Sequence, residues 1–169
     1  MYRQHSFCSF CGHPFAEHQP WPRLCANCGS TTYRNPLPVV LLLQPVDDGL
    51  LLIRRAAYPR RGQLALPGGF IEMGERWQDA AARELQEEAG VEVDSALISD
   101  FAVRSTSDGY LLVFGLGPQL RSEDLPRFLP NSEAAERVIV TAPIELAFPL
   151  HTEMVAHFFT QLRQWRPLT

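Results

Sequence analysis

Three glutamates within five residues are the most chemically distinctive feature of this 169-residue sequence. Glu84, Glu87 and Glu88 follow a Gly-Gly pair at residues 68–69, which is predicted to form a turn. Carboxylates this close together repel one another unless a cation lies between them. Oxygen ligands suit Mg²⁺ or Mn²⁺, which proteins commonly hold with a few carboxylates together with substrate phosphates. The pattern therefore predicts a divalent-metal site.

The segment that carries these glutamates is predicted to be one helix. Residues 75–89 contain no proline or glycine and are rich in helix formers, and Gly90 supplies a C-terminal stop. Because Glu84 and Glu88 are four residues apart, their carboxylates share one helical face. The apolar stripe expected to dock on a core is formed by Trp77, Ala81, Leu85 and Ala89. The ordinary alternative is a solvated surface helix on which Arg83 neutralises neighbouring acids.

All four cysteines lie near the N-terminus in two C-x-x-C pairs, Cys8 with Cys11 and Cys25 with Cys28. Two such pairs separated by a short loop indicate a zinc site. Four thiolates complete a tetrahedral shell, so the Zn²⁺ is expected to be structural. Two disulfides or a redox pair are the competing interpretation. We expect residues 1–36 to form a small four-cysteine zinc ribbon that depends on its metal for folding.

Composition describes an ordinary globular chain, with 46% hydrophobic and 20% charged residues. The formal net charge of −4 argues against a general nucleic-acid binder. All fifteen basic residues are arginine, which excludes a Schiff-base lysine and a P-loop lysine. No apolar run approaches the ~20 residues of a membrane-spanning helix, and residues 1–7 lack an apolar signal core. We therefore expect a cytoplasmic protein with no membrane partner.

The remaining sequence predicts an α+β domain over residues 37–169. Strands are expected at residues 39–46, 50–55, 63–66, 92–103, 110–116 and 136–141. A surface loop with a helical turn is expected within residues 117–131. A final amphipathic helix is expected over residues 152–165, with Val155, Phe158, Phe159 and Leu162 on its apolar side. This order predicts a mixed β-sheet packed between two helices.

The segment around the glutamates resembles the Nudix box at every defining position. The matching residues are Gly69, then Glu75, then Arg83-Glu84-Leu85, then Glu87-Glu88, then Gly90-Val91, separated by five, seven, one and one residues. The resemblance implies an αβα sandwich. It also implies a metal-dependent hydrolase that cleaves a diphosphate joining a nucleoside to another group.

The resemblance further implies roles for individual residues. The implied ligands of Mg²⁺ or Mn²⁺ are Glu84, Glu87, Glu88 and the backbone carbonyl of Gly68. Arg83 would pair with Glu75 and hold the helix against the preceding loop. In relatives, a further glutamate from a later loop often acts as a base or an extra ligand. Glu133 is our preferred candidate for that glutamate, and Glu136 is the alternative.

A zinc ribbon directly before such a domain is similar to the NADH diphosphatase branch of the family. That branch carries a Ser-Gln-Pro-Trp-Pro-Phe-Pro-type motif after the box, and this chain has a different sequence at residues 100–110. The sequence therefore does not distinguish among NADH, NAD, FAD and ADP-ribose as the type of substrate. Candidate base-stacking aromatics are Phe70, Tyr58, Phe101 and Tyr110. Candidate phosphate contacts, which are equally well explained as solvated charges, are Arg54, Arg55, Arg60 and Arg61.

Two other functional classes share this fold. A ligand-sensing or nucleic-acid-binding regulator built on a Nudix domain would predict eroded carboxylates and a basic face, and this sequence has neither. An allylic diphosphate isomerase of the resembling family uses a catalytic cysteine, whereas all four cysteines here are assigned to zinc. The family often dimerises, so a homodimer stays open.

Overall fold

The computed structural model describes residues 4–165, with side chains described as far as Gln161. Contacts divide the chain into two units, Met1–Pro36 and Leu37–Thr169. Among the described residues, no helix combines the length and the apolar character that a bilayer span requires.

The first unit is rich in loops and contains one short hairpin. Strands β1 (Arg23–Leu24) and β2 (Thr31–Thr32) pair antiparallel. The guanidinium of Arg23 lies 4.5 Å from the ring centroid of Trp21. The large side chain of Phe10 is 68% exposed. So small a unit buries little apolar surface of its own.

The second unit is built on a seven-stranded mixed sheet. Its central path has the order β5-β4-β3-β8-β7, with β6 paired to β3 and β9 paired to β4. The strands are β3 (Leu37–Val46), β4 (Gly49–Arg55), β5 (Leu64–Ala65), β6 (Gly68–Phe70), β7 (Ser99–Ser105), β8 (Tyr110–Leu116) and β9 (Ala134–Val140). Strand β3 runs antiparallel to β4 and β6 and parallel to β8.

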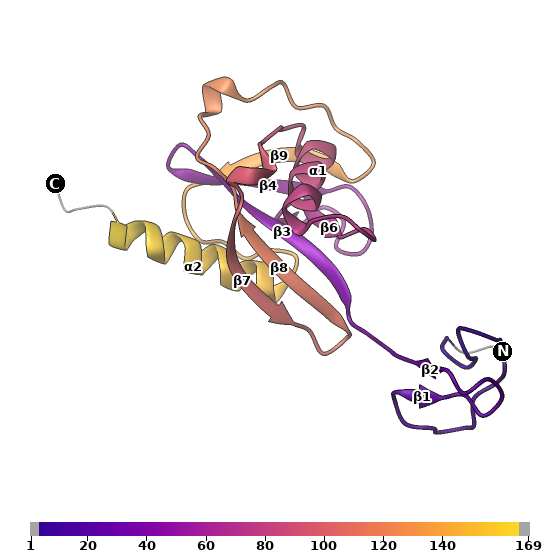
Figure 1. Ribbon diagram of the computed structural model, residues 1–169. Coiled ribbons are helices and arrows are strands. Elements are labelled where there is room, and N and C mark those ends of the chain that lie inside the picture. The colour runs from indigo at the N-terminus through magenta and orange to yellow at the C-terminus, as the bar shows by residue number, and fades with distance from the viewer. Residues whose placement is uncertain (1–3, 166–169) are drawn as a thin grey trace. The chain divides into compact units, whose positions relative to one another are not determined.

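Two helices cover opposite faces of this sheet, α1 (Trp77–Ala89) and α2 (Pro149–Trp165) (Figure 1). Successive side chains of β3 point to opposite faces of the sheet, so this one strand contributes to the core on both sides. Val40 and Leu42 lie in the core beneath α1, whereas Leu41 and Leu43 lie in the core beneath α2. The predicted αβα sandwich with a mixed sheet is therefore confirmed.

The helix predicted over residues 75–89 begins two residues later, at Trp77. The N–H of Glu75 donates to the carbonyl of Glu72 at 3.1 Å, so these residues form a turn before the helix. The predicted stop is confirmed, because Gly90 adopts a φ of 67° and donates to the carbonyl of Gln86.

Other boundaries differ for local reasons. The strand predicted over residues 92–103 begins only at Ser99, because the Asp94 carboxylate accepts from Ala96 N–H at 2.9 Å and stabilises a 3₁₀ turn, η1 (Ser95–Leu97). The helical turn expected near residues 123–128 of the long loop is shorter and lies earlier, as η2 (Ser122–Asp124). Helix α2 begins at Pro149, since proline suits the first helical position. The side chain of Leu162 lies outside the described residues.

Candidate active site

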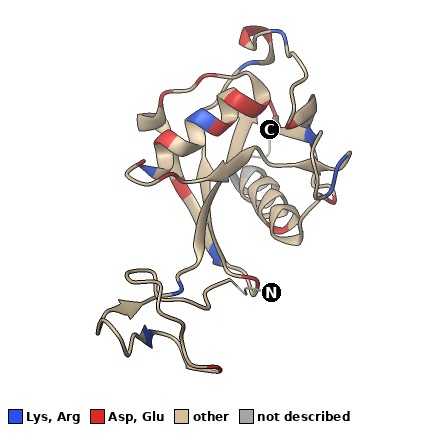
Figure 2. Cartoon of the chain, turned by 90° about the vertical axis from the view of Figure 1, so that its right-hand side faces the viewer, with Lys and Arg blue, Asp and Glu red and all other residues tan. Residues whose placement is uncertain are grey.

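Glu84 and Glu88 lie on the face of α1 that packs on the sheet. Their residues are only 7% and 3% exposed. Ala81 and Leu85 are fully buried on the same helix, and α1 contacts both β3 and β6. The apolar packing of α1 therefore brings two carboxylates into the interior. Figure 2 shows how acidic residues gather along this helix.

A third carboxylate, Glu133, joins these two from the residue just before β9. One oxygen from each of the three side chains lies within 4.8 Å of the others. Burial raises the pKa of Glu88 to about 8, and repulsion from Glu84 and Glu133 adds to the rise. Burial also raises the pKa of the Glu84 carboxyl. We call Glu84, Glu88 and Glu133 the carboxylate cluster.

Arg83 is held at the edge of the carboxylate cluster by five hydrogen bonds. Its Nε and one Nη nitrogen donate to Glu75 at 2.9 and 3.2 Å. The other Nη nitrogen donates to Glu84 at 2.8 Å and to Glu87 at 3.1 Å. The fifth bond reaches the backbone carbonyl of Phe70 at 3.0 Å. These bonds occupy all five N–H groups of the guanidinium, which also lowers the pKa of Glu75.

Glu87 lies outside the carboxylate cluster. Its side chain is 56% exposed, and its carboxylate pairs with Arg83. Adjacent helical positions are rotated by about 100° around the axis, so position 87 points past the edge of the buried face on which Glu88 lies. The structure therefore separates Glu87 from the two other predicted carboxylate ligands of the box.

The Gly-Gly pair forms strand β6 where the sequence predicts a turn. Gly68 donates its N–H to Glu88 Oε2 at 2.8 Å and has a φ of 149°. A Cβ at this position would overlap the carbonyl of Val40. At Gly69 a Cβ would overlap the carboxylate of Glu84. Glycine is needed at both positions because strand β3 lies too close to Gly68, and the Glu84 carboxylate too close to Gly69, to leave room for a Cβ atom.

Asn131 fixes the loop that carries Glu133. Its side-chain oxygen accepts from the N–H groups of Glu133 and Ala134 at 2.9 and 2.8 Å. Its side-chain nitrogen donates to the carbonyl of Glu87 at 2.8 Å. Asn131 therefore ties this loop to the C-terminal end of α1. The sequence reasoning missed this residue, although asparagine just before a strand is typical of such a turn.

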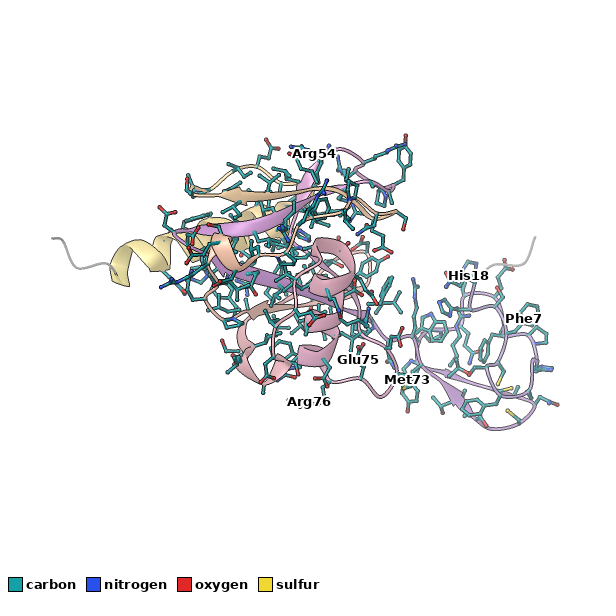
Figure 3. The ribbon with its side chains drawn as sticks, turned by 90° about the horizontal axis from the view of Figure 1, so that it is seen from above. Phe7, His18, Arg54, Met73, Glu75 and Arg76 are labelled. Carbon is teal, nitrogen blue, oxygen red and sulfur yellow. The ribbon has the colours of Figure 1, made fainter. Side chains whose placement is uncertain are left out.

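Glu136, the alternative to Glu133, lies elsewhere. Strands β4 and β9 pair in a register that places Arg54 opposite Glu136, and the two side chains form an ion pair at 2.6 Å. Figure 3 labels Arg54 on this pair of strands and Glu75 before α1. Of the two candidate glutamates, only Glu133 is brought to the carboxylate cluster.

A cavity of about 800 Å³ opens beside the carboxylate cluster. It is lined by Gly68 and Gly69, which contact the cluster, and its rim includes the turn between β7 and β8. Two of the predicted aromatics, Phe70 and Tyr110, line it, with ring centroids 6.3 Å apart.

Of the remaining residues predicted to contact the substrate, one lines the cavity and the others do not. Tyr58 is 83% exposed and is not part of the cavity wall. Phe101 packs against His157, with ring centroids 5.3 Å apart. Of the four candidate arginines, Arg55 alone lines the cavity. His151 also lines it, and no spacing in the sequence had singled out this residue.

The four cysteines form a second cluster, within the first unit. Cys8 Sγ lies 3.7 Å from Cys28 Sγ, and Cys11 Sγ lies 3.7 Å from Cys25 Sγ. All four sulfurs lie within 4.8 Å of one another. A disulfide needs about 2.05 Å, so the disulfide interpretation is wrong. A tetrahedral shell with Zn–S bonds of about 2.3 Å has edges of about 3.8 Å, which these distances match.

Each cysteine pair is followed by the same backbone turn. Gly12 and Gly29 have φ values of 72° and 70°. Their N–H groups donate to the carbonyls of Cys8 and Cys25 at 3.0 and 2.9 Å. The chain thus presents two equivalent sulfur-bearing turns, as expected for a zinc ribbon.

Comparison with known proteins agrees with this geometry. The NUDIX domain model matches residues 35–155, which contain the whole carboxylate cluster. The NAD-capped RNA hydrolase NudC of Klebsiella pneumoniae subsp. pneumoniae is 31% identical over 161 residues, covering 82% of this chain and 60% of that protein. The NudC of Edwardsiella ictaluri is 40% identical over 94 residues, covering 55% of this chain and 36% of that protein. The chain thus spans no more than 60% of the length of these two curated relatives.

A solved structure matches the chain over nearly its whole length. The NUDIX hydrolase from Nitrosomonas europaea superposes with a TM-score of 0.70 at 26% identity, covering 96% of this chain and 94% of that chain. The matched family model, the predicted box and the shared fold lead to one conclusion. The chain belongs to the Nudix hydrolase family.

Proposed function

We propose that this protein is a divalent-metal-dependent hydrolase that cleaves the diphosphate bond of a nucleoside diphosphate linked to another moiety. One observation carries the proposal: Glu84, Glu88 and Glu133 converge within 4.8 Å, and two of them are buried. Buried carboxylates at this separation repel one another strongly unless a cation compensates them. The cavity beside them provides room for a substrate.

The donors of the carboxylate cluster fit Mg²⁺ or Mn²⁺, which prefer oxygen ligands. We assign the ion to Glu84 and Glu88, with the backbone carbonyl of Gly68 as a further ligand. Glu87, which lies farther out, would act through water. When bound, such an ion neutralises phosphate charge and lowers the pKa of water.

The other steps of the reaction are assigned to side chains of the protein. Glu133 is the exposed member of the cluster, so we assign it to accept the proton of the attacking water. Arg83 orients the carboxylate of Glu84 through the bond at 2.8 Å, and Glu75 orients Arg83 in turn. Arg83 and Glu75 are therefore positioning residues.

The proposed substrate class follows from the relatives and from the cavity. The curated relatives are named as hydrolases of NAD-capped RNA. NADH, NAD, FAD and ADP-ribose all present a diphosphate joined to a planar base, as an NAD cap does. We place the free dinucleotides and ADP-ribose first, because a chain with a net charge of −4 is poorly suited to binding an RNA backbone.

For the first unit we propose a structural Zn²⁺ held by Cys8, Cys11, Cys25 and Cys28. The 3.7 Å sulfur separations support this assignment, and four sulfurs leave no open position for catalysis. In this proposal residues 1–36 form the zinc ribbon and residues 37–169 form the hydrolase domain.

A substrate panel tests the proposal. The purified chain is incubated with Mg²⁺ or Mn²⁺ and NADH, NAD⁺, FAD, ADP-ribose, NAD-capped RNA or a nucleoside triphosphate, and the products are identified by mass spectrometry. We expect metal-dependent formation of two monophosphates from at least one dinucleotide or from ADP-ribose. Tight binding without turnover of any member would favour the ligand-sensing alternative.

A matched pair of variants assigns the activity to the carboxylate cluster. Glu88→Gln removes a charge from the proposed metal site, so kcat should fall by several orders of magnitude. Glu92→Gln removes an exposed carboxylate that only pairs with Gln86, and it should leave kcat unchanged. Near-normal turnover in folded Glu88→Gln protein would contradict the assignment.

A further inference from the structure

Three side chains form a continuous wall of the cavity. Arg55 comes from the end of β4, Phe148 precedes α2, and His151 lies in the first turn of α2. The Arg55 guanidinium carbon lies 5.5 Å from the ring centroid of Phe148. The rings of Phe148 and His151 have centroids 4.9 Å apart. Distant parts of the sequence thus place a cation, an aromatic ring and an imidazole side by side.

The bonding of His151 identifies which ring nitrogen carries the proton. Nδ1 accepts from the N–H of Leu66 at 3.3 Å, so the ring is neutral and its proton lies on Nε2. Burial lowers the pKa of His151 to about 3, which agrees with a neutral ring. The residue is only 5% exposed.

The Nε2–H of His151 is a donor without a partner. Within the part of the chain that the structure describes, no hydrogen bond uses Nε2. In that same part, the only unpaired side-chain N or O atom sealed away from solvent is Oε1 of Gln44. Nε2 is therefore accessible, and the space that His151 lines is the cavity. A buried imidazole in the cavity wall thus keeps one N–H available to a ligand.

Arg55 supplies charged donors to the same wall. Its Nε donates to the carbonyl of Pro59 at 2.9 Å, and among the described residues its Nη nitrogens make no hydrogen bond. Its charge acts on Glu88 as well as on His151, so it lies near both the carboxylate cluster and the imidazole. Arg83 differs, because its five N–H groups are all used.

Building on the proposed function, we propose that Arg55 and His151 anchor the nucleoside 5′-phosphate half of the substrate in this cavity. Arg55 binds an oxygen of the phosphate, and His151 Nε2–H donates to an acceptor atom of the heteroaromatic base. Arg55 and His151 both lie beside Phe148, so a donor for the phosphate and a donor for the base are offered by the same wall of the cavity. Apolar walls suited to a planar ring are contributed by Val39, Leu41, Leu66 and Leu112.

Binding of product-like probes tests the role of His151. Calorimetry in Mg²⁺ buffer measures the affinities of AMP, nicotinamide mononucleotide and ribose 5-phosphate for the full chain. His151→Asn keeps an acceptor for Leu66 N–H but lacks the donor at the Nε2 position. It should weaken the better-bound nucleotide about tenfold, the value of one neutral hydrogen bond, and leave ribose 5-phosphate unchanged. His157→Asn, an exposed histidine on the same helix, is the matched control.

A second pair of variants tests Arg55. Arg55→Gln should weaken all three probes by about tenfold or more, because each carries a phosphate. Arg54→Gln is the matched control, since Arg54 is engaged by Glu136 at 2.6 Å and should leave all three affinities unchanged. Equal losses in the two variants would overturn the assignment of Arg55.

A measurement on the wild-type protein tests the same contact without relying on a variant that could misfold. In ¹⁵N-edited NMR spectra, the Nε2 resonance of His151 should shift when the better-bound nucleotide is added, and it should not shift with ribose 5-phosphate. Wild-type affinity in folded His151→Asn protein, or an unmoved resonance at saturation, would overturn the anchoring role. If the wild type hydrolyses a substrate but the variants bind the probes as tightly as the wild type, only this inference fails. If the variants bind the probes more weakly but the wild type hydrolyses no substrate, only the proposed hydrolysis fails.

Discussion

The roles that we propose for two arginines of this site are opposite because their hydrogen bonds differ. Arg83 directs all five of its N–H groups to atoms of the chain, so it stiffens the carboxylate cluster and cannot bind a ligand without breaking a bond. Among the described residues, Arg55 uses only Nε in this way. Counting free donors therefore separates a positioning arginine from a ligand-binding one, which sequence position alone cannot do.

Glu133 and Glu136 provide a sharp comparison at this scale. Glu133→Gln should lower kcat by roughly a hundredfold or more, because the variant loses the proposed base and a charge next to Glu84 and Glu88. Glu136→Gln breaks only the exposed pair with Arg54, worth about 0–1 kcal/mol, and should leave kcat unchanged. Steady-state kinetics and melting temperatures distinguish them. Equal kcat values in the two folded variants would remove Glu133 from the mechanism.

The raised pKa of Glu88 predicts how stability depends on pH without added divalent ions. The folded protein binds a proton here with a pKa of about 8, whereas an unfolded glutamate has a pKa of about 4.3. Between these values the folded state holds more protons, so this group makes the protein less stable as pH rises. His151 contributes only below its unfolded pKa of about 6.5, where acid destabilises the folded state because the ring is buried uncharged.

The window from about pH 6.5 to 8 therefore isolates Glu88 from His151. We expect the melting temperature to fall across this window in the wild type and to fall less in Glu88→Gln. Calorimetric melts in buffers of matched ionic strength measure both slopes. Identical slopes in the two proteins would show that Glu88 does not titrate in this range.

At the scale of elements, the carboxylate cluster depends on hydrogen bonds that hold the loop before β9 against helix α1. Helix α1 supplies Glu84 and Glu88 by the four-residue spacing, which is a local property. The third carboxylate arrives through the turn closed by Asn131, which bonds both the loop and the end of α1. We therefore expect the position of Glu133 in the carboxylate cluster to depend on a residue that lies outside the cluster.

Asn131→Ala tests this fastening. The variant loses the side-chain hydrogen bonds of Asn131, each worth about 1 kcal/mol at most, and releases the backbone at Glu133. We expect a moderate drop in melting temperature together with a large drop in kcat. Ser132→Ala, at the adjacent exposed position, should change neither. A variant with lowered stability and normal kcat would show that Asn131 stabilises the loop without positioning Glu133.

For the whole molecule, the sequence predicted features with a local signature and missed those made by distant pairing. The fold class, the hairpin of β3 and β4, and the shared face of Glu84 and Glu88 each follow from spacing. Strand β6 was predicted as a turn, because the glycines that permit it also suit turns. The placement of His151 depends on a bond to Leu66, 85 residues earlier, and no local pattern encodes that contact.

The cysteine unit can be tested separately from the rest of the molecule. We expect about one Zn²⁺ per chain, measured by plasma mass spectrometry. Cys11→Ser should lose the metal and unfold residues 1–36, because the unit has little apolar core to replace it. Amide exchange should then become fast in residues 4–36 and stay slow in strand β3. A stoichiometry well below one in intact protein would count against the four-sulfur site.

Because Leu66 bonds to His151, 85 residues later in the chain, this part of the molecule can be completed only late in synthesis. The four sulfurs have all left the ribosome once residue 28 has emerged, and the Nudix box once residue 91 has emerged. The cavity wall needs residue 151, so it forms after both. Until then Leu66, Phe114 and the strand residues beneath α2 lack their cover. A stalled chain that ends before α2 would therefore expose an apolar sheet face, the kind of surface that chaperones recognise and that aggregates when it is left unprotected.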